Sequence, residues 1–319
     1  MTQLGHLSVM LDEVIQYLDP QAGETYVDGT FGGGGYARAI LEKADCKVIG
    51  IDRDPAAVLR GQEFKTQYKD RFQMLEGCFG DLEQLLDQAH IDKIDGIVLD
   101  LGVSSFQIDD PARGFSFRFN GPLDMRMGNS GISAKDLVNS ASVEELKFIL
   151  KTYGDERFAG RIASEIVKRR VITPFETTND LASVIRRLVP KSKDGLDPAT
   201  RSFQAIRIVV NNELDEITKV LVAAEKRLAS NGRLVVVSFH SLEDGLVKHF
   251  LKTKSGNIPN VSRFTPILNQ EKAESTFKVL TKQAVKPTFA EIKTNSRSSS
   301  ARLRAGMRID ASASKLKGD

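Results

Sequence analysis

The sequence contains no tryptophan, only two cysteines and only four histidines among 319 residues. Cys46 and Cys78 are not in the spacing of a metal or redox site, and the histidines are scattered, so we expect no bound metal. The chain also lacks a leading basic segment followed by an apolar one, and an apolar run of membrane-spanning length. We therefore expect a cytoplasmic enzyme or binding protein without a membrane partner.

A large charge of one sign is absent as well. Lys and Arg number 45 against 42 Asp and Glu, which leaves a net charge of only +3. This balance does not indicate a nucleic-acid partner, so any basic surface must be argued locally. The hydrophobic content of 41% is ordinary for a globular protein, and the length suits one large or two modest domains.

Glycine, in contrast, is concentrated at one place, where Gly32, Gly33, Gly34 and Gly35 follow one another. A short apolar segment that ends in Asp28 precedes this run, and a helical pattern follows it. Consecutive glycines cost backbone entropy, but they let another molecule approach the main chain beyond the carboxyl end of a parallel strand. The pattern predicts a nucleotide-like cofactor on this loop.

Short apolar segments alternate with helical ones as far as Asp100. Asp54 and Pro55 form a good helix start, because Asp caps helices and Pro suits the first helical position. The alternation predicts a doubly wound parallel sheet in an α/β fold. The expected strands are residues 26–28, 48–52, 72–76 and 94–100, and the expected helices end at 18, begin near 37 and 54, and cover 81–89.

The alternation stops after Asp100. Residues 101–131 resemble functional loops, and 134–190 are helical throughout, with a Thr-x-x-Asp capping pattern before the last helix. Strands and helices then alternate again, which predicts one domain from 1–107 and 205–310, with an inserted helical domain at 108–204. The expected elements are helices at 143–153, 156–170, 178–188, 205–229 and 241–251, strands at 234–239, 276–283 and 300–309, a mobile loop at 254–275 and a disordered tail at 311–319.

Two cofactors fit the glycine loop. Gly32-x-Gly34-x-x-Ala37 matches a dinucleotide fingerprint, with Asp52 placed to hold ribose hydroxyls, so a nicotinamide dehydrogenase is one alternative. S-adenosylmethionine is favoured by Asp28, which would repel a pyrophosphate but suits a ligand with an ammonium and a sulfonium. Acids also end two further predicted strands, at Asp52 and Asp100. The purely structural alternative is that the glycines form a tight strand-to-helix turn and that the acids only cap helices.

The segment from Asp100 to Gln107 follows the fourth predicted strand, where a methyl acceptor would face the cofactor. An amine on a base is a poor nucleophile because its lone pair is delocalised, and Asp100 could accept its protons and localise that pair. Ser104, Ser105 and Gln107 could hold the base edge or the methionine end of the cofactor. Alternatively, this polar loop satisfies its own backbone.

Cations and aromatic residues mix in the segment from Arg113 to Phe119. They would suit a platform on which unpaired bases stack, or the phenylalanines could instead be buried. The segment around Arg126 is equally ambiguous. The run from Lys168 to Arg170 would suit a phosphate track, or a solvated helix face.

Seven motifs carry a resemblance to a known protein family. The resemblance extends from about His6 to Arg308, and the chain departs from the family at Tyr36, where His is usual, and at Phe106, where Pro is common. The motifs are Asp-Gly-Thr-Phe-Gly-x-Gly-Gly (28–35), Ile-Asp-Arg-Asp-Pro (51–55), Leu-Asp-Leu-Gly-Val-Ser-Ser (99–105), Arg-Gly-Phe-Ser-Phe (113–117), Gly-Pro-Leu-Asp-Met-Arg-Met (121–127), Arg-x-Phe-Gln-Ala-x-Arg (201–207) and Ser-Phe-His-Ser-Leu-Glu-Asp (238–244).

These motifs are similar to those of the MraW (RsmH) family of bacterial ribosomal RNA methyltransferases. The resemblance implies a class I methyltransferase with a Rossmann-like sheet, in which the inserted helical domain recognises substrate. It implies methylation of the N4 amine of a cytidine in the decoding centre of 16S ribosomal RNA, in the small ribosomal subunit. It leaves open a homodimer, a different nucleic-acid substrate such as DNA, and a ribosome assembly factor without enzymatic activity. Family cofactor contacts map onto Gly34, Gly35, Tyr36, Asp52, Phe79, Asp100 and Gln107.

These arguments give three sets of candidate residues. The catalytic candidates are Asp100 and Ser105. The cofactor candidates are Asp28, Gly32, Gly34, Gly35, Tyr36, Asp52, Phe79, Asp100 and Gln107. The candidates for RNA binding are Arg113, Arg118, Arg126, Lys168, Arg169, Arg170 and His240.

Overall fold

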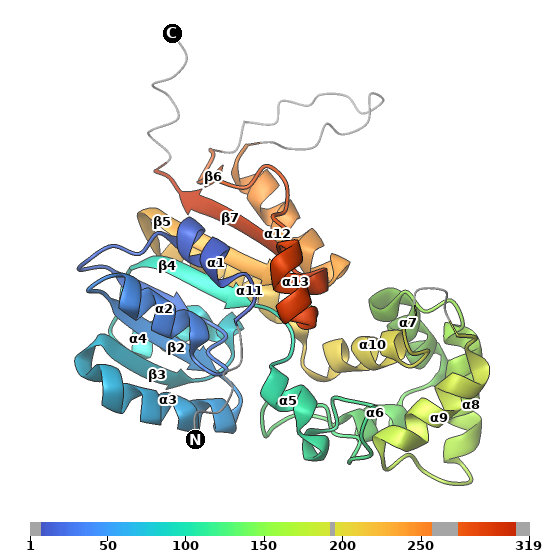
Figure 1. The fold of residues 1–319 in the computed structure, drawn as a ribbon. Coiled ribbons are helices and arrows are strands. Elements are labelled where there is room, and N and C mark those ends of the chain that lie inside the picture. Colours follow the sequence, from blue (N-terminus) through green and yellow to red (C-terminus); the bar gives the residue numbers. More distant parts are fainter. Residues whose placement is uncertain (1–7, 192–194, 257–273, 311–319) are drawn as a thin grey trace, which may run out of the picture. The chain divides into compact units, whose positions relative to one another are not determined.

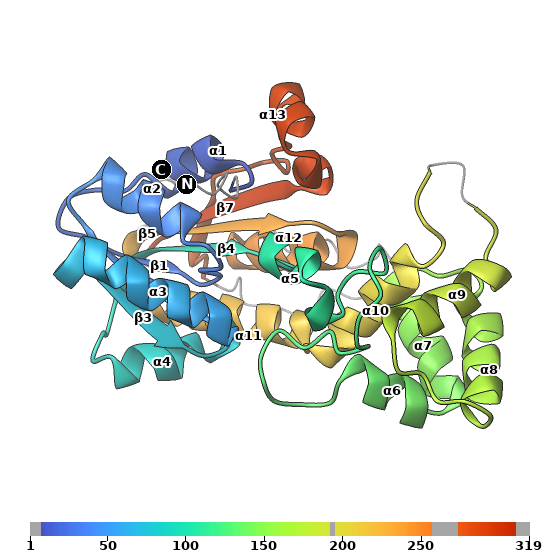
Figure 2. The same ribbon diagram turned by 60° about the horizontal axis from the view of Figure 1, so that its bottom comes forward.

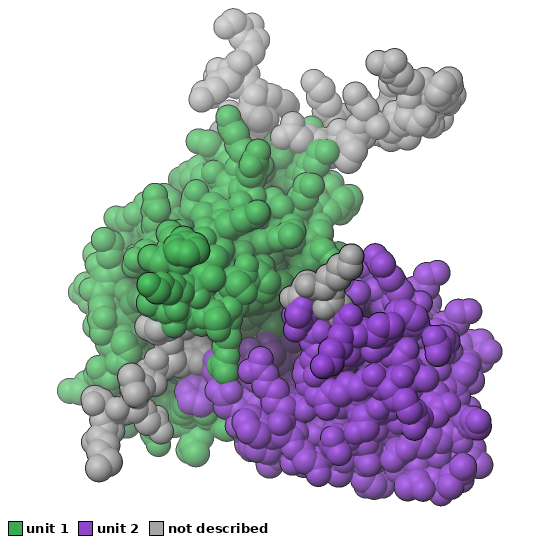
Figure 3. Space-filling model, turned by 45° about the vertical axis from the view of Figure 1, so that its right-hand side comes forward, with its two compact units in different colours: residues 1–102, 214–319 green, residues 103–213 purple. Residues whose placement is uncertain are grey.

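The computed structural model describes residues 8–191, 195–256 and 274–310. The chain divides into two compact units, coloured separately in Figure 3. The first unit combines residues 1–102 with 214–319, and the second comprises 103–213. The sequence assigned substrate recognition to an inserted domain at 108–204, and this assignment stays a prediction.

A seven-stranded sheet with the order β3-β2-β1-β4-β5-β7-β6 forms the centre of the first unit (Figure 1). The first five of these strands pair in parallel, and β7 runs antiparallel to both β5 and β6. The predicted fold is confirmed: this is a Rossmann-like, doubly wound sheet. The strands are β1 (Thr25–Asp28), β2 (Lys47–Asp52), β3 (Phe72–Glu76), β4 (Ile94–Asp100), β5 (Leu228–Ser238), β6 (Phe277–Val279) and β7 (Arg302–Arg308).

Helices cover both faces of this sheet, which explains why its central strands are apolar on both sides (Figure 2). One face packs against α1, α2 and α3, and the other packs against α4, α11 and α12. The helices that belong with the sheet are α1 (Leu11–Leu18), α2 (Gly35–Lys43), α3 (Pro55–Tyr68), α4 (Leu82–Gln88), α11 (Glu213–Arg227), α12 (Ser241–Lys254) and α13 (Phe289–Thr294).

The strand register brings three acids to one edge of the sheet. Asp28 pairs with Gly50 of β2 and with Val98 of β4, each two residues before the acid that ends its own strand. Asp28, Asp52 and Asp100 therefore lie at the carboxyl edge. The strand order reverses between β1 and β4, and ligands of doubly wound sheets bind in the crevice at such a point.

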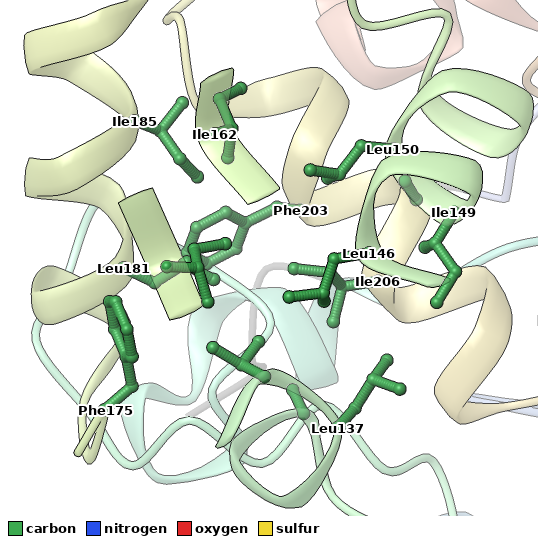
Figure 4. Close-up of a cluster of buried hydrophobic side chains, with 14 of the residues drawn as sticks. Leu137, Leu146, Ile149, Leu150, Ile162, Phe175, Leu181, Ile185, Phe203 and Ile206 are labelled. Carbon is green, nitrogen blue, oxygen red and sulfur yellow. The ribbon is translucent and has the colours of Figure 1, made fainter. Parts of the chain in front are cut away.

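The second unit is helical around its own apolar core (Figure 4). Leu146, Ile162, Leu181 and Phe203 are among the core side chains, and they come from four different helices. The predicted capping pattern is confirmed, since the Thr177 hydroxyl accepts the Asp180 N–H. The helices are α5 (Ser105–Asp109), α6 (Ala134–Ser140), α7 (Val143–Gly154), α8 (Ala159–Arg170), α9 (Thr178–Leu188) and α10 (Thr200–Val210).

The single helix predicted at 205–229 is wrong. The segment forms α10 and α11, which are separated at Asn212, whose φ of 51° is left-handed. Asn211 is buried beside the break, where its amide donates to the Met125 carbonyl and accepts the Met127 N–H, both at 2.8 Å. These contacts are distant in sequence, so a local helical pattern could not reveal them.

Other elements also differ from the prediction, and β6 in particular covers only Phe277–Val279 of the strand expected at 276–283. Helix α8 begins at Ala159 rather than at residue 156, and the short helices α5 and α13 were not predicted. Strand β5 begins at Leu228, earlier than the strand expected at 234, and its register against β4 shifts near its start. The predicted loop at 254–275 lies largely outside the described residues, and the predicted tail at 311–319 lies entirely outside them.

Within the described ranges, no helix has both the length and the apolar character needed to cross a membrane.

Candidate functional site

The glycine loop joins β1 to α2 and has a backbone that side chains would disturb. Gly34 has a left-handed φ of 75°, and a Cβ atom there would lie 2.7 Å from the Phe31 ring. A Cβ on Gly35 would lie 1.8 Å from the Ser8 hydroxyl. Gly34 is thus required by the conformation and close packing of the loop itself, quite apart from any ligand, and Gly35 leaves room for the Ser8 side chain.

Asp28 lies beneath this loop and is only 1% exposed. Its carboxylate accepts the Thr30 N–H at 3.3 Å and the Ala37 N–H at 3.1 Å, so it fastens both ends of the loop. Burial raises the pKa of Asp28 to about 7, and the charge of Asp52 adds to this shift. The candidate cofactor residue therefore has a clear structural task, and its buried charge has no cationic partner among the described residues.

Asp52 connects the end of β2 to the same loop. Its two carboxylate oxygens accept the Gly32 N–H at 2.8 Å and the Asp54 N–H at 2.9 Å. A carboxylate offers about four lone-pair sites, so these two bonds leave capacity for ribose hydroxyls. Asp54 caps α3 by accepting the Ala56 N–H at 3.0 Å, which confirms the predicted cap and leaves Asp52 without that task.

Replacing Asp52 with alanine should weaken S-adenosylmethionine binding by about 1–3 kcal/mol, the usual cost of leaving polar partners unmade. Calorimetric titration would measure this change. The matched control is Asp54→Ala, which removes the neighbouring cap and should lower the melting temperature while leaving affinity nearly unchanged. Equal affinities in wild type and Asp52→Ala would remove Asp52 from the site.

Asp100 ends β4 and holds an unusual carboxylate. Its backbone N–H donates to the Thr30 hydroxyl at 2.7 Å, which fixes the strand end against the glycine loop. Its Oδ1 atom is buried and has no hydrogen-bond partner among the described residues. Burial, and then the charges of Asp28 and Glu243, raise the pKa of Asp100 well above its usual range. A buried acceptor of this kind suits a cation or an amine donor.

Tyr36 lies in α2 directly after the glycines and is 3% exposed. Its hydroxyl donates to the Val9 carbonyl, so the side chain fastens the segment that precedes α1. The Met10 N–H of that segment in turn donates to Glu291 of α13 at 2.7 Å. Burial raises the pKa of Tyr36 well above its usual range, which keeps the phenol neutral. The phenol thus has a structural partner of its own, and only the backbone of Tyr36 is left for a ligand.

Phe79 follows β3 and is half-buried, as an adenine-stacking ring would be. The next residue, Gly80, donates its N–H to Glu216 of α11 at 3.1 Å. A Cβ on Gly80 would lie only 2.2 Å from that carboxylate, so the contact needs glycine. Glu216 therefore holds the turn that carries Phe79, a role that no local pattern in the sequence indicated.

Ser105 and Gln107, which were predicted to contact substrate or cofactor, form the first turn of α5 in the second unit. The Gln107 side chain accepts the Ser104 N–H at 3.0 Å, and the Ser104 hydroxyl accepts the Gln107 N–H at 3.2 Å. This capping box is the self-satisfied polar loop that the sequence left open as an alternative. Ser105 is half-buried at the first helical position.

Two of the predicted RNA-binding arginines have partners inside the second unit. Arg113 donates to the carbonyls of Arg126 and Met127 at 3.0 and 2.8 Å. Arg126 forms two bonds with the carboxylate of Asp124, at 2.9 and 2.7 Å. Both guanidinium groups thus hold the loop between α5 and α6 together.

The cations of the basic run on α8 differ in whether they have partners inside the second unit. Arg169 pairs with Asp180 at 3.3 Å and lies over the Phe175 ring at 4.2 Å. Arg170 donates to two carbonyls at the end of α6, at 2.9 and 2.7 Å. Lys168, in contrast, is exposed. The RNA-binding role of all three residues stays a prediction, but only Lys168 presents its charge to solvent.

His240, also predicted to bind RNA, begins α12 in the first unit and is largely buried. Its Nδ1 atom accepts the Glu243 N–H at 3.4 Å, and its Nε2 atom lies 3.0 Å from a Glu243 carboxylate oxygen. Glu243, fully buried, also accepts the Phe239 N–H at 2.7 Å. Sequence reasoning missed Glu243 and Thr30 as neighbours of Asp100, although both lie inside motifs that carried the family resemblance.

At the carboxyl edge, then, buried acids gather around the glycine loop. None of the described lysines or arginines forms an ion pair with Asp28 or Asp100. Such an edge would repel the pyrophosphate of a dinucleotide and would stabilise a ligand with ammonium and sulfonium charges. The uncompensated acids and the orphaned oxygen of Asp100 fit S-adenosylmethionine better than a nicotinamide cofactor.

Comparison with known proteins gives one consistent result. The sequence model of the MraW methylase family matches residues 3–309. A protein of Rhodospirillum rubrum named ribosomal RNA small subunit methyltransferase H is 54% identical over 308 residues, which cover 96% of this chain and 94% of that protein. The protein of the same name from Acidiphilium cryptum is 52% identical, over 97% and 99% of the two chains. A Streptococcus mutans structure with bound S-adenosylhomocysteine has a TM-score of 0.42 and 13% identity, over 95% of this chain and 99% of that chain.

Proposed function

We propose, from the premise that this chain belongs to the MraW methylase family, that it methylates the N4 amine of a cytidine in the decoding centre of 16S ribosomal RNA. S-adenosylmethionine is its methyl donor. The observation that carries the chemistry is the buried, unpartnered oxygen of Asp100 at the carboxyl edge of the sheet.

Four parts of the first unit would hold the cofactor. Asp52 would accept hydrogen bonds from the ribose hydroxyls, Phe79 would lie against the adenine, and the backbone at Gly34 and Gly35 would contact the rest of the ligand. Asp28 would contribute its charge from below the loop. When bound, S-adenosylmethionine supplies an electrophilic methyl group on a positively charged sulfur.

Asp100 would activate the cytosine amine that accepts the methyl group. The lone pair of a cytosine amine is delocalised into the ring, and a hydrogen bond from this amine to Asp100 localises the pair on nitrogen. The positive charge of the cofactor favours the ionised form of Asp100. When the methyl group leaves sulfur for nitrogen, the amine would lose a proton, and Asp100 would hold it because its buried environment favours the protonated state.

The proposed substrate class is based on the names of the related proteins. Proteins that are about half identical over nearly their whole length carry names that specify ribosomal RNA of the small subunit. A base inside a duplex cannot reach a buried acid, so the cytidine would be flipped out or unpaired. The second unit, with exposed cations such as Lys168 and Arg118, would bind the surrounding RNA. The reaction would take place in the cytoplasm, where small subunits are assembled.

Nucleoside mass spectrometry tests this function directly. Small subunits that lack the modification should gain N4-methylcytidine when they are incubated with the protein and S-adenosylmethionine. Transfer of label to DNA instead would favour a different nucleic-acid substrate, and binding to subunits without any transfer would favour an assembly factor. A melting temperature raised by NADH rather than by S-adenosylmethionine would favour a dehydrogenase.

A further inference from the structure

The three phenylalanines of the segment at 115–119 have different environments in the second unit. Phe115 is only 9% exposed and belongs to the core. Phe117 packs edge-to-face against Phe203, with ring centroids 5.1 Å apart. Phe119 is 52% exposed, although only one residue separates it from Phe117. Of the two alternatives that the sequence left open, burial describes the first two rings and does not describe Phe119.

The backbone that carries Phe119 is firmly held. Thr178, which is fully buried, donates its hydroxyl to the Phe119 carbonyl at 2.9 Å and its N–H to the Gly121 carbonyl at 2.9 Å. Its hydroxyl also accepts the Gly121 N–H at 3.2 Å. A Cβ on Gly121 would lie 1.8 Å from the Pro111 carbonyl oxygen, so the turn is close-packed as well. An exposed ring on a fixed backbone loses little entropy when a ligand binds.

Arg118, next to Phe119, differs from the other arginines predicted to bind RNA. Its side chain is exposed, and within the described ranges it has no carboxylate or carbonyl partner, whereas Arg113 and Arg126 are bonded inside the unit. Asn120, on the other side of the ring, is exposed too, and its side-chain oxygen accepts the Asn179 N–H at 3.4 Å. A cation, an aromatic ring and an amide thus follow one another on the surface.

We propose that Arg118 and Phe119 form a binding site for an unpaired nucleotide of RNA. The base stacks on the Phe119 ring, and the Arg118 guanidinium binds the adjacent phosphate. A single strand fits better than a duplex, because bases stacked inside a duplex do not expose their faces to a side chain. If the partner were a protein, the positive charge of Arg118 beside the ring would have no chemical explanation. The proposal rests on the proposed function for its RNA, and it assigns a contact of the second unit in addition to the residues of the cofactor edge.

The test uses the full chain and a short single-stranded RNA that carries the fluorescent base 2-aminopurine, at about 50 mM salt where electrostatic binding is strong. Stacking on Phe119 should quench the fluorescence. Phe119→Ala should abolish this quenching and weaken binding about tenfold or more, as removal of one stacking ring does. Phe119→Trp should restore both, and Arg118→Ala should weaken binding and flatten its salt dependence while the quenching of the bound RNA remains.

Two controls separate the site from general effects. Phe289→Ala removes a ring that is 83% exposed in the first unit and should change nothing. Affinity for a duplex of the same sequence should fall in Arg118→Ala but not in Phe119→Ala. Affinity of Phe119→Ala for the single strand equal to that of wild type overturns the proposal, as does failure of the wild-type chain to bind it.

Methyl transfer to small subunits distinguishes this proposal from the proposed function. If both hold, Phe119→Ala should raise KM for subunits without lowering kcat or the affinity for S-adenosylmethionine. If Phe119→Ala transfers methyl groups with an unchanged KM for subunits, the nucleotide site is contradicted and the proposed methyltransferase activity is not. The reverse outcome is a wild-type protein that modifies no ribosomal RNA but loses single-strand binding in Phe119→Ala. That result would support the nucleotide site and contradict the proposed function.

Discussion

Replacing Asp100 with asparagine should lower kcat for methyl transfer by about a hundredfold or more, while affinity for S-adenosylmethionine falls much less. Asparagine keeps the size of the side chain but cannot hold the proton that the amine loses. The two quantities are measured by single-turnover transfer to small subunits and by calorimetric titration of the cofactor. The opposite ranking, with affinity lost and kcat kept, would make Asp100 a cofactor ligand only.

The same variant carries its own control for folding. The pKa of Asp100 is raised by burial and by the neighbouring charges of Asp28 and Glu243, so the ionised carboxylate costs stability. Because the folded-state pKa lies above the unfolded value, this cost is absent below the unfolded pKa and develops as pH rises toward the folded one. The melting temperature of Asp100→Asn should therefore equal or exceed that of wild type above neutral pH. A large fall would mean that the kcat loss reports misfolding.

Affinity for S-adenosylmethionine should rise as pH increases from about 6 to 7.5, by up to about tenfold per pH unit for each proton released. The cause is Asp28, whose pKa burial raises to about 7, so that the free protein holds a proton there in slightly acidic solution. A positively charged ligand favours the ionised carboxylate and expels this proton. Above the folded pKa no proton remains to be released, and the affinity should level off.

Calorimetry in buffers of different ionisation enthalpy counts the released protons. S-adenosylhomocysteine is the matched ligand, because it has the same shape without the sulfonium charge, and its affinity should depend on pH less steeply. Asp28→Asn should flatten the profile of S-adenosylmethionine, and it should also lower the melting temperature because the Thr30 or Ala37 N–H loses its acceptor. Parallel pH profiles for the two ligands would rule out this coupling.

Local patterns predicted the parts of the fold that depend on neighbours in sequence. Alternating apolar segments revealed the parallel sheet, and acids at strand ends indicated the edge at which Asp28, Asp52 and Asp100 gather. Asp54 before Pro55, and Thr177 three residues before Asp180, marked helix starts that the structure contains. Each of these signals needs no more than a few adjacent residues, because caps and strand ends are local features.

Contacts between distant residues were beyond such patterns. The break at Asn212 depends on the bonds of Asn211 to a loop more than eighty residues away. The cations on α8 looked equivalent in the sequence, and only the bonds of Arg170 to carbonyls about thirty residues earlier separate it from Lys168. The missing partner of the Asp100 oxygen is likewise a property of the assembled site, since no sequence motif states what an atom fails to contact.

The bond between Met10 and Glu291 joins positions 281 residues apart, and it has a consequence for synthesis. A ribosome releases the segment before α1, the glycine loop and β4 long before α13 emerges, so the segment that Tyr36 holds cannot acquire this second anchor until α13 has been made. Strand β5 cannot join β4 until the whole second unit has been made, whereas that unit has a core of its own. Since domains generally fold as they are synthesised, the second unit can be complete first. The cofactor edge, which is held by segments far apart in the sequence, would then mature last, and a chain interrupted before residue 291 would keep its helical unit while lacking the finished site.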